Sequence, residues 1–177
     1  MPTKWKIDPS HSEIQFKVKH LMITTVTGYF KEFSLDVETE NDGDFTTASK
    51  IEFKAVLGSL DTNSAQRDGH LKSDDFFNVD KYPALTFVGK KYEKDGDNAK
   101  VQGDLTIRDV TKPVTFNVEF GGLAVDVYGQ AKAGFTVDGK INRKDFGLSW
   151  DAVTEAGAVV VSNEIRLHGE IQVIRQA

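Results

Sequence analysis

The sequence predicts an all-β fold, an extended antiparallel barrel of about eight strands with one short helix at about residues 63–73. Apolar and polar residues alternate with period two along most of the chain. Turn-forming residues separate the alternating segments, and only one stretch has the spacing of a real helix. The 177 residues suffice for one sizeable core, so we expect a single barrel domain over residues 1–177.

Each predicted strand has one apolar and one polar face. The alternation is clearest in four segments, whose inward members are Ile14, Phe16 and Val18; Ile51, Phe53, Ala55 and Leu57; Val101, Gly103, Leu105 and Ile107; and Val114, Phe116, Val118 and Phe120. Similar segments lie at 29–39, 84–92, 124–137 and 158–174, and hairpin turns are expected at 41–44, 95–98, 121–122 and 138–139. Long one-sided strands joined by tight turns favour a closed barrel over a flat sheet.

The predicted helix carries a polar cluster and has Asn63 or Ser64 as its expected N-cap. Helical spacing places Arg67, His70 and Asp74 on the face that turns toward the sheet. One interpretation is a general acid–base site, with His70 polarised by Asp74. The other, which we favour, is a polar lock that holds the helix over one end of the barrel, because charges turned inward must be paired. The sequence leaves open whether Arg67 then meets Asp74 or the head group of a ligand.

The composition argues against several classes of function. The net charge is −5 and the sequence pI is near 5.4, so the chain lacks the basic character that nucleic-acid binding needs. The absence of cysteine excludes disulfides, thiol catalysis and zinc sites with sulfur ligands. The four histidines are scattered without metal-ligand spacing, so we expect neither a metal nor a cofactor.

The N-terminal residues 1–8 contain no apolar run and no small-residue cleavage site of a secretory signal. We therefore expect a cytoplasmic protein without stable membrane insertion, or a periplasmic one if a leader has been removed. The sequence leaves open whether the protein is a monomer or a homodimer.

The interior of such a barrel is either packed solid or open to one small ligand. Large rings beside glycines can leave a channel, and periodicity alone does not separate the two alternatives.

Several short motifs, in order and spread over nearly the whole chain, are similar to one known family. They are DPSHS at 8–12, RDGHLKSDDFF at 67–77, YP at 82–83 with TF at 86–87, GDLTIRDVTKPV at 103–114 and NRKDFGL at 142–148. They resemble the YceI-like family. The family pattern usually has glycine where this chain has Asp109 at a predicted turn.

The resemblance implies a lipocalin-like barrel that binds a polyisoprenoid, such as a polyprenyl diphosphate or an isoprenoid quinone, or another long amphiphile. The expected role is that of a carrier, a store or a stress-related sensor. No catalytic residues carry over, so we expect no enzyme; the alternative is an enzyme that acts on a lipid head group through Arg67, His70 and Asp74. The expected ligand-binding residues are Phe16, Val18, His20, Phe30, Phe53, Leu57, Arg67, Phe76, Phe87, Phe116, Phe135, Phe146 and Trp150.

Overall fold

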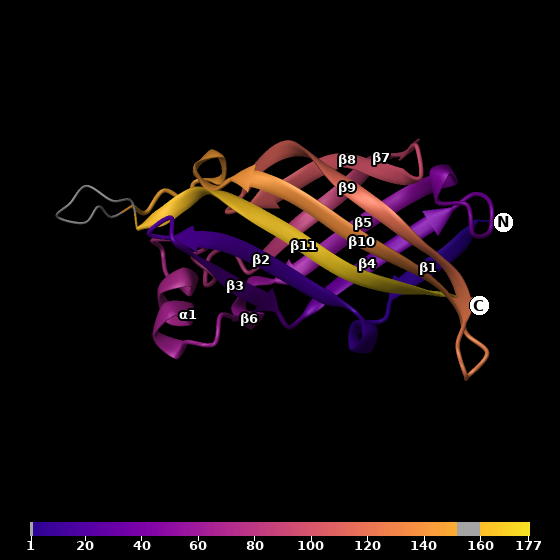
Figure 1. Ribbon diagram of the computed structural model, residues 1–177, viewed down its shortest axis with the longest axis horizontal. Helices are drawn as coiled ribbons and strands as arrows, with labels where there is room; N and C mark the ends of the chain where they lie inside the picture. The colour runs from indigo at the N-terminus through magenta and orange to yellow at the C-terminus, as the bar shows by residue number, and fades with distance from the viewer. Residues whose placement is uncertain (1, 152–159) are drawn as a thin grey trace.

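The computed structural model describes residues 2–151 and 160–177, and its described part is an antiparallel barrel that is longer than it is wide (Figure 1). Pairing between β1 and β11 closes a ring of eight strands, which confirms the predicted fold class. In order around the ring, the strands are β1 (Thr3–Ile7), β4 (Phe33–Thr39), β5 (Ala48–Val56), β7 (Ala84–Asp95), β8 (Asn98–Ile107), β9 (Val110–Val125), β10 (Ala131–Asn142) and β11 (Val161–Arg175).

Three further strands lengthen the wall beyond this ring. They are β2 (Glu13–His20), β3 (Thr24–Phe30) and β6 (Leu60–Asp61). Both β1 and β2 pair with β11, and the short 3-10 helix η1 (Pro9–His11) interrupts the path between them. The long strand β11 therefore joins the closed ring to its extension.

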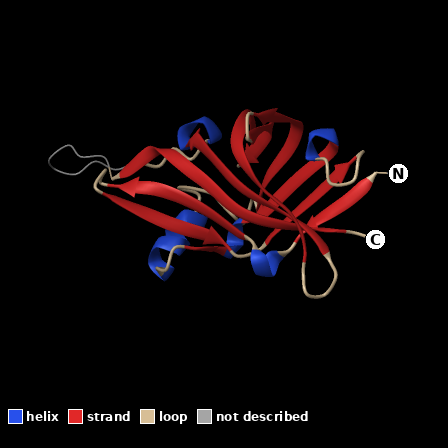
Figure 2. Cartoon of the chain, turned by 45° about the vertical axis from the view of Figure 1, so that its right-hand side comes forward, coloured by secondary structure: helices blue, strands red, loops and turns tan. Residues whose placement is uncertain are grey.

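The predicted helix is α1 (Ala65–Lys72), with Ser64 as the N-cap, whose hydroxyl accepts a hydrogen bond from the amide of Arg67 at 3.3 Å. It lies at one end of the barrel, while both chain termini lie at the other (Figures 1 and 2). We call these the helix end and the terminus end. The remaining 3-10 helices of the described chain are η2 (Phe45–Thr47), η3 (Leu57–Ser59) and η4 (Arg143–Phe146).

Two of the four predicted hairpin turns are wrong, because residues 121–122 lie inside β9 and residues 138–139 lie inside β10. The register between these strands shifts between Gly134 and Phe135, opposite Gly122, which has a φ of +109°. Gly122 lies at this β-bulge, and Gly139 lets the ring of Phe116 pack directly against the backbone. The strands are instead joined by residues 126–130.

The other predicted strand limits also change in detail. The segment 29–39 is divided between β3 and β4, and the turn at 95–98 is the β7–β8 hairpin, as predicted. The predicted strand 158–174 corresponds to β11, although residues 158–159 lie outside the described residues.

Candidate functional site

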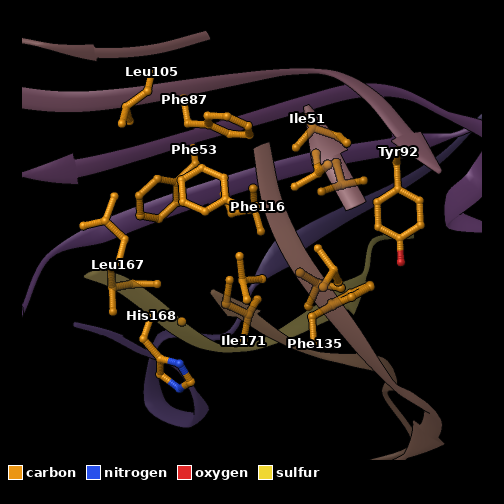
Figure 3. Close-up of a pocket in the computed structure, with 18 of the residues that line it drawn as sticks. Ile51, Phe53, Phe87, Tyr92, Leu105, Phe116, Phe135, Leu167, His168 and Ile171 are labelled. Atoms are coloured by element: carbon orange, nitrogen blue, oxygen red, sulfur yellow. The ribbon is translucent and has the colours of Figure 1, made fainter. Parts of the chain in front are cut away.

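A largely apolar cavity of about 150 Å³ lies inside the barrel. Its most prominent members are the rings of Phe53, Phe87, Phe116 and Phe135, which come from four different strands (Figure 3). The rings of Phe87 and Phe116 meet edge to face, with their centroids 5.0 Å apart. We call this space the central cavity.

Glycines in the wall explain how a barrel with so many rings keeps an open interior. A Cβ atom added to Gly139 would stand 2.3 Å from the ring of Phe116, and one added to Gly28 would stand 2.1 Å from the ring of Phe16. Each ring therefore lies against the backbone of a neighbouring strand, where any other residue would hold it away. Rings that lie against the wall leave the middle of the barrel less filled.

Tyr92 and His168 are the polar residues that line the central cavity. The imidazole of His168 points away from the ring cluster (Figure 3) and meets Asp138 at 2.5 Å and Glu170 at 2.9 Å. The phenol of Tyr92 has no hydrogen-bond partner among the described residues, and burial raises its pKa. A ligand in this cavity would thus meet hydrocarbon and one phenol.

A second cavity, of about 190 Å³, lies at the helix end and is called the helix-end cavity. Apolar side chains dominate it, among them Phe16, Phe76 and Trp150. It differs from the central cavity in its polar members, which are Lys19, His20, Arg67, His70 and Arg143. The two cavities together have an apolar interior and basic groups at one end.

Arg143 is a structural member of the helix-end cavity. Its side chain is 1% exposed, and burial lowers its pKa although Asp151 at 3.8 Å opposes the change. The guanidinium donates to the carbonyl of Ser162 at 2.9 Å and to those of Leu148 and Trp150 at 2.6 Å each. These bonds hold the start of β11 against the segment that follows η4, so Arg143 has little capacity for a ligand.

Arg67 does not meet Asp74, which was one of the two partners that the sequence left open. The Nε and Nη2 atoms of Arg67 donate to the hydroxyl and the carbonyl of buried Thr62, at 2.8 and 2.5 Å. Thr62 also donates through its amide and its hydroxyl to the carboxylate of Asp68. Thr62 therefore fixes the helix to the chain just before it. Because threonine is uncharged, the sequence did not single it out as a partner of Arg67 and Asp68.

The acid–base interpretation required His70 to meet Asp74, and it does not, because α1 ends at Lys72 and helical spacing does not extend to Asp74. His70 instead meets Asp75, with Nε2 and Oδ2 2.9 Å apart. Asp74 is bound by Arg108, whose guanidinium contacts its carboxylate at 3.2 Å and its carbonyl at 2.7 Å. Arg67, His70 and Asp74 thus have three different partners and do not form one acid–base site.

Most of the residues predicted to contact a ligand line one of the two cavities. Leu57 and Phe146 line neither cavity and are fully buried, at 0% and 1% exposure. The predicted residues in the central cavity are Phe30, Phe53, Phe87, Phe116 and Phe135; those in the helix-end cavity are Phe16, Val18, His20, Phe30, Arg67, Phe76 and Trp150.

Other residues that line the central cavity were not among the expected ligand contacts. Leu85 has the same strand parity as Phe87, so a stricter use of parity would have found it, and Ile51 was already expected to point inward. Tyr92 has the opposite parity to Phe87. A register shift between Gly89 and Lys91 reverses the faces and turns Tyr92 inward, which period two does not predict.

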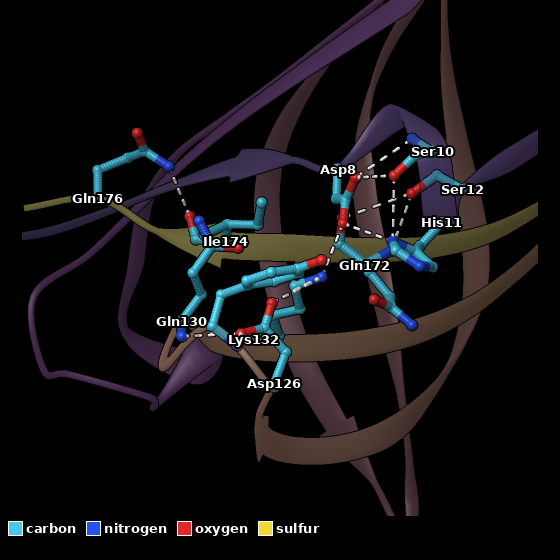
Figure 4. Close-up of polar contacts among 11 residues, drawn as sticks. Asp8, Ser10, His11, Ser12, Asp126, Gln130, Lys132, Gln172, Ile174 and Gln176 are labelled. Carbon is cyan, nitrogen blue, oxygen red and sulfur yellow. Dashed lines mark hydrogen bonds and ion pairs between the residues drawn. The ribbon is translucent and has the colours of Figure 1, made fainter.

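A separate polar cluster ties the barrel together at the terminus end (Figure 4). Lys132 lies 2.8 Å from Asp8 and 3.3 Å from Asp126, and the pKa of Asp8 is held well below its ordinary value mainly by the hydrogen bond from Lys132. Ser10 and His11 complete the cluster.

The residue types of this cluster suggest a Ser-His-Asp triad, but its geometry does not fit one. Ser10 and Asp8 both contact the same ring atom of His11, Nδ1, at 3.1 and 2.8 Å. A triad needs the nucleophile and the carboxylate on opposite nitrogens of the ring. The cluster therefore closes a turn.

Among the described residues there is no group of three or more histidine or acidic side chains placed to hold a metal ion. Within residues 2–151 and 160–177, no helix combines the length and the hydropathy needed to cross a membrane.

Comparisons with known proteins agree with this architecture. A UPF0312 protein of Staphylococcus epidermidis is 37% identical over 171 residues, and one of Staphylococcus aureus is 36% identical over 172 residues; each match covers 96% of both chains. The crystal structure of a Campylobacter jejuni YCEI protein is 36% identical and superposes with a TM-score of 0.75 over 90% of both chains.

Two more distant structures share the fold. BcnA of Burkholderia cenocepacia is 20% identical, with a TM-score of 0.79 over 94% of this chain and 98% of its own. A polyisoprenoid binding domain from Saccharophagus degradans is 16% identical, with a TM-score of 0.64 over 97% and 98%. The sequence model of the YceI-like domain matches residues 5–173, and this chain belongs to the YceI-like family.

Proposed function

We propose that this protein binds a long isoprenoid or a similar amphiphilic lipid inside its barrel, as a carrier, a store or a stress-related sensor. The observation that carries the proposal is the polarity of the lumen: two apolar cavities share residues, and basic groups gather in the one at the helix end. The likeness to the Saccharophagus degradans domain, whose description names polyisoprenoid binding, supports the choice of ligand class.

The affinity for such a ligand would come from its tail. Each buried methylene is worth about 0.8 kcal/mol, so ten of them give roughly 8 kcal/mol before ordering costs. That gross value corresponds to roughly micromolar binding. A tail enclosed by hydrocarbon needs few polar contacts, in keeping with a lining in which Tyr92 supplies the one phenol.

The head group of the ligand would lie at the helix end. Arg67 uses Nε and Nη2 for Thr62, while its Nη1 has no partner among the described residues. Lys19 also lines this cavity, and its ammonium group has no partner among the described residues. Arg143 donates to carbonyls and Arg108 to Asp74, so we assign the contact with a phosphate or a quinone oxygen to Arg67 and Lys19.

The test is a titration of the purified protein with farnesol and with farnesyl diphosphate, followed by native mass spectrometry. Both should bind, and Arg67→Gln should weaken the diphosphate by roughly threefold to tenfold while leaving farnesol unchanged. The matched control is Arg166→Gln, because Arg166 is exposed and forms a loose 3.8 Å pair with Glu164. If neither farnesol nor farnesyl diphosphate binds, the proposal is refuted.

A further inference from the structure

The two cavities are separated by three side chains that line both of them. Phe30 comes from β3, Leu85 from β7 and Leu167 from β11. A side chain that faces two cavities stands between them, so these residues form a partition across the lumen, which we call the septum. The septum divides a long interior into two compartments of about 150 and 190 Å³.

Neither compartment alone has room for a long isoprenoid. A protein cavity of about 150 Å³ holds a molecule of roughly the size of benzene. A tail of many isoprene units would therefore have to pass through the septum and occupy both compartments. A short tail can bind in one compartment with the septum closed.

Phe30 is the fixed member of the septum. Its side chain is 3% exposed, and its ring lies 5.1 Å from the ring of Phe16 and 6.4 Å from that of Phe77. Moving this ring would break aromatic contacts on its helix-end side. Leu85 and Leu167 have no ring contacts to lose, so opening begins with a rotation of these leucines and is limited by Phe30.

We propose that the septum is a gate that selects linear isoprenoid chains by length; this inference rests on the proposed function. A chain that ends before the septum binds without opening it. A longer chain opens the gate once and then gains the burial of every unit beyond it. The ligand class that suits such a gate is a thin, flexible tail, since a fused-ring lipid could not pass between three side chains.

The experiment offers prenol, with one isoprene unit, and farnesol, with three, as an equal mixture in one detergent. Prenol is small enough for one compartment, whereas farnesol needs both. Native mass spectrometry then measures the ratio of the two bound species. In Phe30→Leu, which removes the ring and keeps an apolar side chain, the ratio of farnesol to prenol should rise roughly threefold to tenfold over wild type. Leu167→Ala tests the same gate from another strand if Phe30→Leu fails to fold.

The matched control is Phe33→Leu. Phe33 is half-buried, packs against the hydrophobic cluster of Trp5 and Phe45, and lines neither cavity. The ratio of the two bound prenols in this variant should equal that of wild type. If both prenols bind but no septum variant changes the ratio, the gate is refuted and the proposed function stands. If neither prenol binds to any protein, the proposed function fails, and the gate with it.

Discussion

The two ends of the barrel accommodate buried charge in different ways. At the terminus end, Asp8 and Lys132 are each 11% exposed and meet at 2.8 Å, so one charge is matched by another. At the helix end, Arg143 is 1% exposed and is surrounded by carbonyl oxygens, with Asp151 at 3.8 Å. The first end uses an ion pair, whereas the second uses mainly backbone dipoles.

This difference matches the division of labour that we propose. The ion-paired cluster at the terminus end links the β1–β2 connection to β10 and to the β9–β10 turn, and it borders neither lumen cavity. Arg143 stands in the wall of the helix-end cavity, where a buried carboxylate would repel an anionic head group. Carbonyl acceptors satisfy the guanidinium without adding a full negative charge beside the ligand.

The largest expected effect is that of Arg143→Met. The substitution keeps apolar volume but leaves three carbonyl groups without their donor, and buried unpaired groups cost about 1–3 kcal/mol each. We expect the free energy of unfolding to fall by about 3–5 kcal/mol, measured by urea denaturation. Arg166→Met, at an exposed pair, should change it by less than about 1 kcal/mol. Equal losses in the two variants would contradict a special role for Arg143.

The terminus end should be distinguished by its response to acid. The pKa of Asp8 is lowered in the folded protein relative to its ordinary 3.8, mainly by the hydrogen bond from Lys132. Its contribution to stability is therefore complete well above pH 3.8 and is lost as the pH falls through the lower folded pKa. Asp8→Asn should cost about 2 kcal/mol at neutral pH and progressively less below pH 3.8.

Urea denaturation of wild type and Asp8→Asn at a series of pH values measures this difference. Asp36→Asn is the control, since Asp36 lies on the same wall in a loose 3.9 Å pair with Lys6. A difference that stayed constant down to strongly acidic pH would mean that Asp8 acts through packing rather than through its charge.

The fold was predictable because period two is a property of the strand backbone itself. The two misplaced turns show the limit of composition as a guide. Gly139 resembles a turn residue in the sequence, yet it lies within β10 because the ring of Phe116 from β9 occupies the space of its missing side chain. That contact joins residues far apart in the chain, so the local sequence does not reveal it.

The site was predictable where the strand parity held and not where it failed. Phe53, Phe87 and Phe116 line the central cavity because their strands are regular over these residues, whereas a bulge turned Tyr92 inward. Arg67 and His70 do not meet Asp74 because α1 ends at Lys72, before the helical spacing reaches it. An open lumen could not be distinguished from a solid one, since that depends on ring orientation. The cytoplasmic location stays a prediction, and the choice between monomer and homodimer stays open.

The two hairpin turns that flank β8 differ in which residues adopt a positive φ. At the β7–β8 turn, the residue with positive φ is Gly96, at 64°. At the β8–β9 turn, Arg108 and Asp109 have φ values of 51° and 63°, although neither is glycine. Arg108 is fixed there by the carbonyls of Asp74 and Phe76, so the turn serves to anchor the segment that follows α1.

Asp109 has no such anchoring contact within the described part of the chain, and its substitution should have the smallest effect. A side chain in the left-handed region costs about 1–2 kcal/mol, while glycine costs about 1 kcal/mol through the entropy of the unfolded chain. Asp109→Gly should therefore raise the free energy of unfolding by about 0.5 kcal/mol, and Asp109→Ala should lower it, because alanine keeps the Cβ without the polar side chain that favours this conformation. Urea denaturation of both variants measures the signs. A stabilising Asp109→Ala would mean that the strain at this turn is already relieved by the bonds of Arg108.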